Sequence, residues 1–144
     1  MADIPGIPTK ITLQVVAPER ALVNEVVDEV EIPGADGYFG VWPGHTPMLA
    51  ALDIGTLWYR QGSEKHYLAI AYGFVEVQPD HVTVLARTAE KAGEIDTARA
   101  QAAKQRAEGR MATFSMDVDF ERARIALLKS LMRLRAAEQA RMRS

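Results

Sequence analysis

In the first half of the chain, apolar and polar residues alternate along short segments, which is the period of a β-strand with one buried face. The alternation is clearest over residues 11–16, where Ile, Leu and Val are separated by Thr and Gln. The segments with strand composition are 11–16, 23–32, 55–60, 66–71, 74–77 and 82–86. Strands this short, with turn signals about every 8–12 residues, are typical of an all-β sandwich or barrel. We therefore expect a β-sandwich domain over residues 1–88.

Glycine, proline and polar residues mark the turns between these segments. Residues 61–65 and residues 78–81 each separate two strand-like segments and are expected to close hairpins. The segment 37–45 is instead predicted to be a structured loop, because its glycines permit positive φ and close backbone approach. Its larger side chains are Tyr38, Trp42 and His45. The pattern leaves open whether Trp42 is exposed or partly buried in the core.

Asp96 marks the change from strand-like to helical periodicity. Its carboxylate suits an N-cap, since it can accept hydrogen bonds from free backbone N–H groups of the first helical turn. Alanines then recur at helical spacing, and a second helix is expected after a break at residues 112–116, capped by Asp119 or Asp117. Two helices joined by a short loop predict an antiparallel hairpin within residues 89–144. Because the first helix offers little besides alanine to bury, we expect the hairpin to be held weakly.

The net charge of −2 conceals an asymmetry between the two parts of the chain. Residues 1–94 carry 13 acidic and 6 basic side chains, a net −7, whereas residues 95–144 carry 6 and 11, a net +5. A basic helical segment is usually a solvated face, but it can also dock on an acidic surface or on phosphates. The absence of cysteine excludes a disulfide framework and a thiolate metal site. No stretch approaches the ~18 apolar residues of a membrane span, so we expect no direct insertion into a bilayer.

The sequence contains no catalytic constellation. Its histidines, His45, His66 and His81, are far apart and have no i,i+4 partner, so we expect no metal site. No serine lies in a G-x-S-x-G motif, and no G-K-[ST] follows the glycine-rich segment as a P-loop requires. An enzyme is therefore the least favoured interpretation.

The basic residues of the helical part are the remaining candidates for a binding site. Arg99 and Arg106 are two turns apart and share one face of the first helix, and Lys129 and Arg133 share one face of the second. A folded hairpin could bring these cations together beside Asp96, where they could hold a polyphosphate by charge-assisted hydrogen bonds. The alternative is an ordinary solvated basic face, and the spacing alone leaves both open.

Four motifs occur in an order and spacing that together are specific. They are Val16-Ala17-Pro18-Glu19, Gly37-x-x-Gly40-Val41-x-Pro43-Gly44-His45-x-Pro47, Gly73-Phe74-x-Glu76-Val77 with Val82-Thr83-Val84-Leu85, and Ile95-Asp96-x-x-Arg99-Ala100. Through these motifs the chain resembles, over nearly its whole length, the epsilon subunit of bacterial F-type ATP synthase, which is called delta in mitochondria. The resemblance implies an N-terminal β-sandwich of about ten strands, a C-terminal antiparallel two-helix hairpin and a non-catalytic role.

The resemblance also implies partners and a location. Members of this family belong to the central stalk, bind the gamma subunit and the ring of c subunits, and help to couple ion-driven rotation to ATP synthesis. The chain is thus expected as a peripheral subunit at the cytoplasmic face of the bacterial plasma membrane. The residues expected to contact the c ring are Tyr38, Trp42 and His45. Tyr38 stands where a relative has a carboxylate facing the ring, and Tyr72 where a Gly-Gly pair is usual.

Some bacterial members bind ATP in the folded hairpin, so the resemblance implies ATP as a regulatory ligand, with no cofactor required. The positions that match the family's contacts are Glu90, Ile95, Asp96, Arg99, Arg106, Lys129 and Arg133. Lys129 departs from the arginine of the best ATP binders, because it keeps the charge but lacks the planar fork.

An extended hairpin in this family inhibits ATP hydrolysis by entering the catalytic alpha/beta head. The basic residues of the second helix expected to make this contact are Arg122, Arg124, Lys129, Arg133 and Arg135. The competing interpretation is a free-standing β-sandwich binding module, whose basic tail docks on nucleic acid or another acidic partner. The family interpretation implies no nucleic acid.

Overall fold

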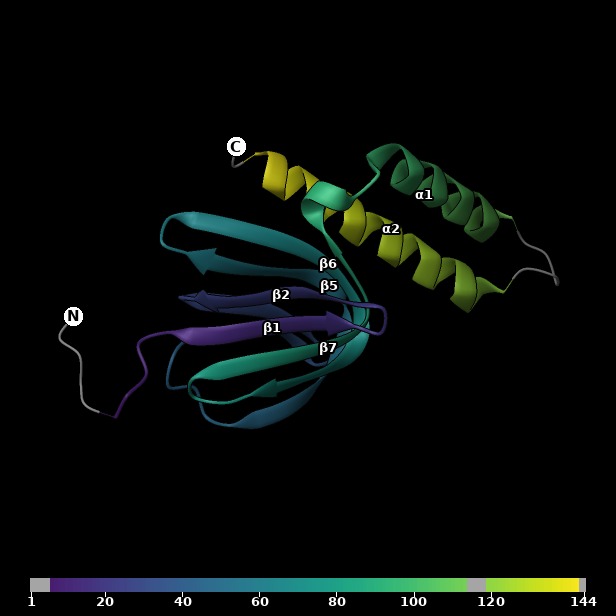
Figure 1. Ribbon diagram of the computed structural model, residues 1–144. Helices are drawn as coiled ribbons and strands as arrows, with labels where there is room; N and C mark the ends of the chain where they lie inside the picture. Colours follow the sequence, from purple (N-terminus) through teal and green to yellow (C-terminus); the bar gives the residue numbers. More distant parts are fainter. Residues whose placement is uncertain (1–5, 114–118, 143–144) are drawn as a thin grey trace.

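The computed structural model describes residues 6–113 and 119–142, which form a β-domain followed by two helices (Figure 1). The strands are β1 (Ile11–Ala17), β2 (Arg20–Val27), β3 (Glu29–Gly34), β4 (Gly37–Val41), β5 (Met48–Gln61), β6 (Glu64–Val77) and β7 (His81–Lys91). The helical elements are the short 3-10 helix η1 (Ala92–Glu94), α1 (Thr97–Ala112) and α2 (Phe120–Arg141).

The strands form one sheet that folds back on itself and so makes both layers of a sandwich. Its order is β2-β1-β7-β6-β5-β3-β4, and neighbours are antiparallel except for the parallel pair β1 and β7. The pairing among β5, β6 and β7 is interrupted at Asp53, Tyr72 and Arg87. The three strands bend there and pass from one layer to the other (Figure 1).

This bend explains the number of strands. About ten are expected, whereas the described residues form seven. The first parts of β5 and β7 and the second part of β6 lie with β1 and β2, and the remaining parts lie with β3 and β4. Each layer thus contains five strand segments, or ten in all. The predicted fold, a sandwich followed by a helical hairpin, is confirmed, and the strand counts differ because three strands serve in both layers.

Two stretches differ from the sequence-based prediction. In both, hydrogen bonding to a neighbouring strand decides the structure, although the local hydrophobic pattern does not indicate a strand. The segment 37–45 is predicted to be a loop, but its first five residues form β4, an edge strand that pairs with β3. Glycine weakens the strand signal without preventing edge pairing. Residues 48–54 show no clear alternation, yet they form the first half of β5.

The predicted strand 23–32 is two strands, because the chain changes layer at Asp28. The Asp28 carboxylate accepts a hydrogen bond from the Gly62 N–H at 2.7 Å. Lys10 also donates to it, and Arg60 lies 3.4 Å away. The lysine hydrogen bond is the main cause of the lowered pKa of Asp28. This side chain therefore ends β2 and fixes the crossing.

The two layers enclose a continuous aliphatic core. The predicted inward positions of β1 are correct, since Ile11, Leu13 and Val15 are all 0% exposed. Other fully buried core residues are Val27, Val30, Ile32, Val41, Leu57, Leu68, Val75, Val77, Val82 and Val84. The period-two alternation therefore identifies the buried face of the sandwich.

The bend depends on two consecutive residues of β6 with left-handed backbone. Tyr72 has φ 61° and Gly73 has φ 127°. A Cβ at position 73 would lie 2.0 Å from the carbonyl oxygen of Leu85 on β7, so only glycine lets the strands approach this closely. Tyr72 adopts its left-handed conformation at a cost that glycine would not incur.

Both helices begin at an aspartate N-cap, as the sequence predicts. Asp96 Oδ1 accepts from the backbone N–H of Arg99 at 3.0 Å, and Asp119 makes the equivalent bond at 3.0 Å. The alternative cap, Asp117, lies outside the described residues, as does most of the expected break at 112–116. Neither α1 nor α2, as far as they are described, is long and apolar enough to cross a membrane.

The hairpin packs on only one face of the sandwich. The second helix, α2, lies along the outer surface of β5 and β6, and α1 lies beyond α2, away from most of the sheet (Figure 1). The predicted alanine stripe is confirmed, since Ala100 and Ala107 of α1 are 0% and 3% exposed. The cluster beneath α2 is small and consists of Tyr67, Ala69, Ile95 and Ala136.

We expect Gly73→Ala to destabilise the fold by about 2–4 kcal/mol, because the added methyl group collides with β7 and the left-handed backbone disfavours alanine. Urea unfolding measures this change. Gly109→Ala is the matched control, since among the described residues nothing beyond the backbone of its own helix lies within 4 Å of the added Cβ. The control is expected to leave stability unchanged or raise it by up to about 1 kcal/mol. Equal stability of the two variants would show that the bend does not need glycine.

Candidate functional site

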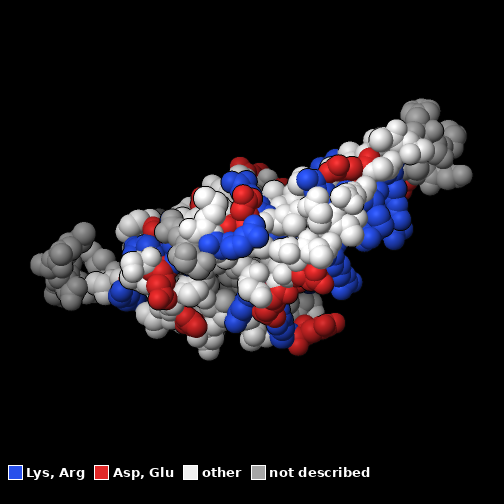
Figure 2. Space-filling view, turned by 90° about the horizontal axis from the view of Figure 1, so that it is seen from above, with Lys and Arg blue, Asp and Glu red and all other residues white. Residues whose placement is uncertain are grey.

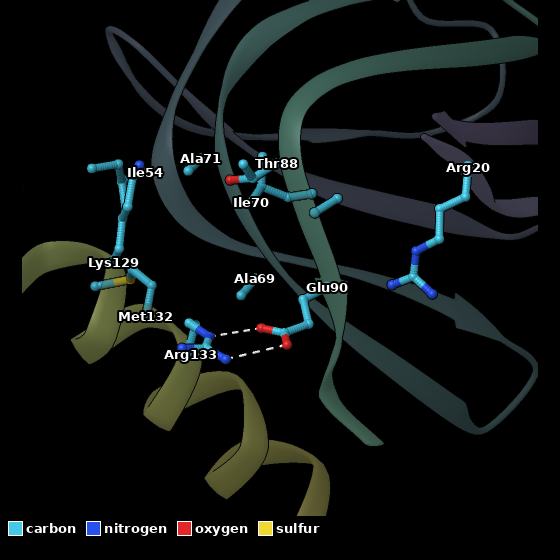
Figure 3. Close-up of a pocket in the computed structure, with 11 residues that line it drawn as sticks. Arg20, Ile54, Ala69, Ile70, Ala71, Thr88, Glu90, Lys129, Met132 and Arg133 are labelled. Atoms are coloured by element: carbon cyan, nitrogen blue, oxygen red, sulfur yellow. Dashed lines mark hydrogen bonds and ion pairs between the residues drawn. The ribbon is translucent and has the colours of Figure 1, made fainter. Parts of the chain in front are cut away.

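A cleft of about 270 Å³ lies between α2 and the sheet, beside the part of β6 that precedes the bend and the part of β7 that follows it. Lys129, Met132 and Arg133 project into it from α2 (Figure 3). The floor of the cleft is lined by Ile54, Ala69, Ile70, Ala71, Thr88 and Ala89. Its rim is charged, with Glu90 from β7 and Arg20 from β2. A mainly apolar floor with a charged rim suits an amphipathic ligand.

The strongest contact across this cleft is a bidentate ion pair. Arg133 Nε donates to Glu90 Oε1 at 2.7 Å, and Arg133 Nη2 donates to Glu90 Oε2 at 3.2 Å. The two side chains are only 25% and 30% exposed. Paired guanidinium–carboxylate bonds are directional and stronger than neutral hydrogen bonds. The pair therefore tethers α2 to the end of β7.

A second ion pair joins β2 to the connecting turn η1. Arg20 Nη1 donates to Glu94 Oε2 at 2.7 Å. This hydrogen bond lowers the pKa of Glu94 and raises the pKa of Arg20. The two side chains are 46% and 42% exposed, so solvent screens their attraction. The same Arg20 also lines the cleft that contains Glu90.

Cations from two elements lie close to the ring of Tyr72. The guanidinium carbon of Arg87 is 5.4 Å from the ring centroid, and Lys129 Nζ is 6.0 Å from it. Both distances are within the range of cation–π attraction. The tyrosine that replaces an expected glycine thus contacts the lysine that replaces an expected arginine. These two departures from the family pattern are neighbours in space.

The structure brings three of the seven predicted ATP-binding residues into this cleft, namely Glu90, Lys129 and Arg133. Ile95 is only 9% exposed and lies in the apolar cluster beneath α2. The Asp96 carboxylate is engaged in capping α1. Neither Ile95 nor Asp96 lines the cleft.

Arg99 and Arg106 lie on the exposed surface of α1, each one residue before a buried alanine. The opposite flank of α1, which carries Lys104, lines a separate groove with Leu131 of α2. Helical spacing therefore places the two arginines on one side of the hairpin. Lys129 and Arg133 of α2 lie on the same side. The predicted cations share a flank, and two of them line the cleft.

Basic side chains gather over the helical end of the molecule (Figure 2). Of the residues predicted for the inhibitory contact, Arg122, Arg124 and Arg135 are exposed, and Arg124 pairs with Glu121 at 2.6 Å. The other two, Lys129 and Arg133, are partly buried against the sheet. The docked hairpin thus conceals part of this basic set. No group of three or more potential metal-binding side chains occurs among the described residues.

The three residues predicted to contact a c ring have different surroundings. Tyr38 is 49% exposed, but its hydroxyl accepts from the Thr56 N–H at 3.0 Å and lies 4.0 Å from Met132 Sδ. Trp42 is 59% exposed, which excludes the core position left open by the sequence, and Arg60 lies 6.0 Å from its ring. His45 is partly buried, with Nδ1 2.7 Å from the Thr46 carbonyl oxygen.

A surface that the sequence analysis missed lies on the outer face of the other layer. Leu49, Phe74 and Leu85 are 72%, 59% and 54% exposed. Phe74 pairs directly with Leu85, and Leu49 lies two residues from the partner of Phe74 on β5. The signal was present, since the segments 74–77 and 82–86 have apolar residues on their outward face as well. We call Leu49, Phe74 and Leu85 the apolar face.

Comparison with known families identifies the chain. The beta-sandwich domain of the ATP synthase Delta/Epsilon chain matches residues 10–92, and the long alpha-helix domain of the same family matches residues 94–138. The chain belongs to the ATP synthase delta/epsilon family. The ATP synthase epsilon chain of Syntrophobacter fumaroxidans is 48% identical over 130 residues, covering 90% of this chain and 97% of the relative. That of Desulforamulus reducens is 46% identical over 126 residues, with 88% and 96% covered.

Chains in two solved structures of mitochondrial ATP synthases have the same fold. A chain in a cryo-EM structure of Euglena gracilis mitochondrial ATP synthase superposes with a TM-score of 0.78 at 24% identity, covering 95% of this chain and 84% of that one. A chain from the central stalk and c-ring of Tetrahymena thermophila mitochondrial ATP synthase gives 0.56 at 13% identity, with 90% and 99% covered. The likeness supports the sandwich-and-hairpin fold of this chain.

We expect Arg133→Ala to loosen the docking of α2, because it leaves the partly buried Glu90 carboxylate without its bidentate partner. Hydrogen exchange of the α2 amides should become faster by roughly ten- to hundredfold, as the loss of a charge-assisted contact of about 1.5–3 kcal/mol implies. Arg122→Ala is the matched control, because this exposed arginine of the same helix does not line the cleft. Equal exchange rates in both variants would contradict a tethering role for the Arg133–Glu90 pair.

Proposed function

We propose that this chain is the epsilon subunit of an F-type ATP synthase. In this role it is a non-catalytic part of the central stalk that couples ion-driven rotation of the c ring to ATP synthesis. It associates peripherally with the cytoplasmic face of the bacterial plasma membrane through its partner subunits, and it binds no nucleic acid. The support is family membership together with end-to-end similarity to relatives named ATP synthase epsilon chain.

The observation that carries this proposal is the apolar face. The hairpin covers one outer face of the sandwich, whereas Leu49, Phe74 and Leu85 leave the other outer face apolar and more than half exposed. A contiguous apolar surface on a protein of this kind marks a docking site. We assign this face to the gamma subunit.

The c ring is assigned to β4 and the residues that follow it. Trp42 offers a large, exposed ring with few rotatable bonds, which suits a contact surface. Tyr38 contributes the exposed side of its ring, while its hydroxyl is held by the Thr56 N–H. His45 completes the set from the loop after β4.

The gamma contact is tested by Phe74→Glu. We expect this variant to bind purified gamma at least tenfold more weakly, because it places a charge in the centre of a buried apolar contact. Titration calorimetry measures the affinity, and co-purification with gamma and c subunits checks assembly. Phe120→Glu is the matched control, since Phe120 is 47% exposed in the first turn of α2. If the wild-type chain binds no gamma, the free-standing binding module becomes the better interpretation.

We also propose that the hairpin inhibits ATP hydrolysis when it leaves the sandwich and enters the alpha/beta head. The exposed basic residues Arg122, Arg124 and Arg135 would meet acidic surface there, joined by Lys129 and Arg133 once α2 is released. The small apolar cluster beneath α2 is compatible with such release.

A chain ending after Lys91, the last residue of β7, should raise the ATPase activity of the reconstituted complex severalfold and leave assembly intact. The cut follows β7 so that no ladder hydrogen bond is lost. The control replaces Arg122, Arg124 and Arg135 by Gln within the full chain, which should relieve inhibition partly and reduce its salt dependence. Unchanged ATPase activity of the truncated complex would exclude an inhibitory role.

We further propose that ATP binds the folded hairpin and favours it. The phosphates would be held by Arg99, Arg106, Lys129 and Arg133, which share one flank, and Glu90 would accept from the ribose or the adenine amino group. Ile95 and Asp96, at the start of the hairpin, would contact the base. A ligand that bridges both helices adds its binding free energy to the weak alanine packing between them.

Calorimetric titration of the full chain with ATP tests this site. We expect Arg99→Ala and Arg133→Ala each to weaken binding by about 1.5–3 kcal/mol, which is tenfold or more. Lys104→Ala is the matched control, because Lys104 lies on the opposite flank of α1. No heat at millimolar ATP would show that the chain lacks the site, and equal effects of all three substitutions would place it elsewhere.

A further inference from the structure

Glu90 is flanked by arginines from two different elements. Arg133 of α2 binds it from the hairpin side through the two hydrogen bonds at 2.7 and 3.2 Å. Arg20 of β2 lines the same cleft from the sandwich side, with its guanidinium turned toward the strand that carries Glu90 (Figure 3). Glu90 contributes to the raised pKa of Arg20, although the hydrogen bond that Arg20 donates to Glu94 is the larger cause. The Glu90 carboxylate is therefore paired with Arg133 and has a second arginine, Arg20, nearby.

The two arginines differ in what happens when the hairpin leaves. Arg133 departs with α2, whereas Arg20 stays with the sandwich because it begins β2. Glu90 also stays, since it belongs to β7. Release of α2 costs Glu90 its two charge-assisted hydrogen bonds, and another cation can replace part of that loss. Arg20 has the freedom to move, because its own pair with Glu94 is almost half exposed.

We propose that Arg20 is an exchange partner that takes over the Glu90 carboxylate when Arg133 withdraws, and so lowers the cost of releasing the hairpin. In the docked state, Arg20 binds Glu94 and Arg133 binds Glu90. In the released state, Arg20 remains near both carboxylates and moves to Glu90. This inference rests on the proposed hairpin movement and assigns Arg20 a role in it.

The exchange gives opposite predictions for two substitutions that break the same ion pair. Arg20 stabilises the released state more than the docked state. Arg20→Gln removes this cation, so the docked population should rise. Glu94→Gln costs the docked state its Arg20–Glu94 pair but leaves Arg20 free to bind Glu90, so the docked population should fall. If the pair only fixed the connecting turn η1, both substitutions would favour release.

The experiment measures docking by single-molecule energy transfer in the full chain. Because the natural sequence contains no cysteine, Ser63→Cys in the β5–β6 turn and Met142→Cys at the end of α2 give a unique dye pair. Both positions are exposed. The docked-to-released ratio is recorded in increasing urea below the unfolding transition of the sandwich. Glu19→Gln is the matched control, since it removes a charge beside Arg20 without lining the cleft.

We expect the ratio to rise roughly two- to fivefold in Arg20→Gln and to fall by a similar factor in Glu94→Gln, with no change in Glu19→Gln. Shifts of the same sign in the first two variants, or no shift in either, would overturn the exchange while leaving hairpin movement intact. A wild-type chain that shows no released population at any urea concentration would instead contradict the hairpin movement itself. The two failures are therefore distinguishable.

Discussion

The bend shared by β5, β6 and β7 is the constraint on which the rest of the molecule depends. It makes two layers from one sheet, and it requires Gly73 to lie against the carbonyl oxygen of Leu85. Because β7 continues through the bend, its end carries Glu90 to the face on which α2 lies. The other layer keeps an open outer face with Phe74 and Leu85. One backbone feature thus separates the surface covered by the hairpin from the apolar surface that stays exposed.

The contact between the hairpin and the sandwich differs in kind from the sandwich core. The core is aliphatic and fully buried, whereas the contact consists of Tyr67, Ile95, several alanines and an ion pair. The side-chain oxygens of Thr56 and Gln139 are buried near it without a hydrogen-bond partner among the described residues. Such atoms reduce the gain from docking, since each has lost water without full compensation. The contact between the hairpin and the sandwich is therefore weaker than the contact between the two layers of the sandwich.

The sequence pattern correctly predicted the features that depend on residues close together in the chain. The alternation of Ile11, Leu13 and Val15 identified an inward face, and Asp96 and Asp119 marked both helix starts, because these signals lie within a few residues. The pattern failed where pairing at a distance decides, as at the edge strand β4 and at residues 48–54. Arg20 could not be recognised as part of the cleft, because nothing near it in sequence indicates that β2 begins beside η1. The apolar face was missed because single exposed apolar residues are common.

The position of Arg133 also limits how a polyanion can act on the hairpin. Phosphate groups that bind Arg133 must compete with Glu90, so the gain from the ligand is reduced by the loss of two charge-assisted hydrogen bonds. Lys129 cannot make up that loss by a planar fork, and its ammonium group already faces the ring of Tyr72. A second cation that satisfies Glu90 would remove most of this competition. For the proposed phosphate site, the surroundings of this one carboxylate therefore matter as much as the number of arginines on the flank.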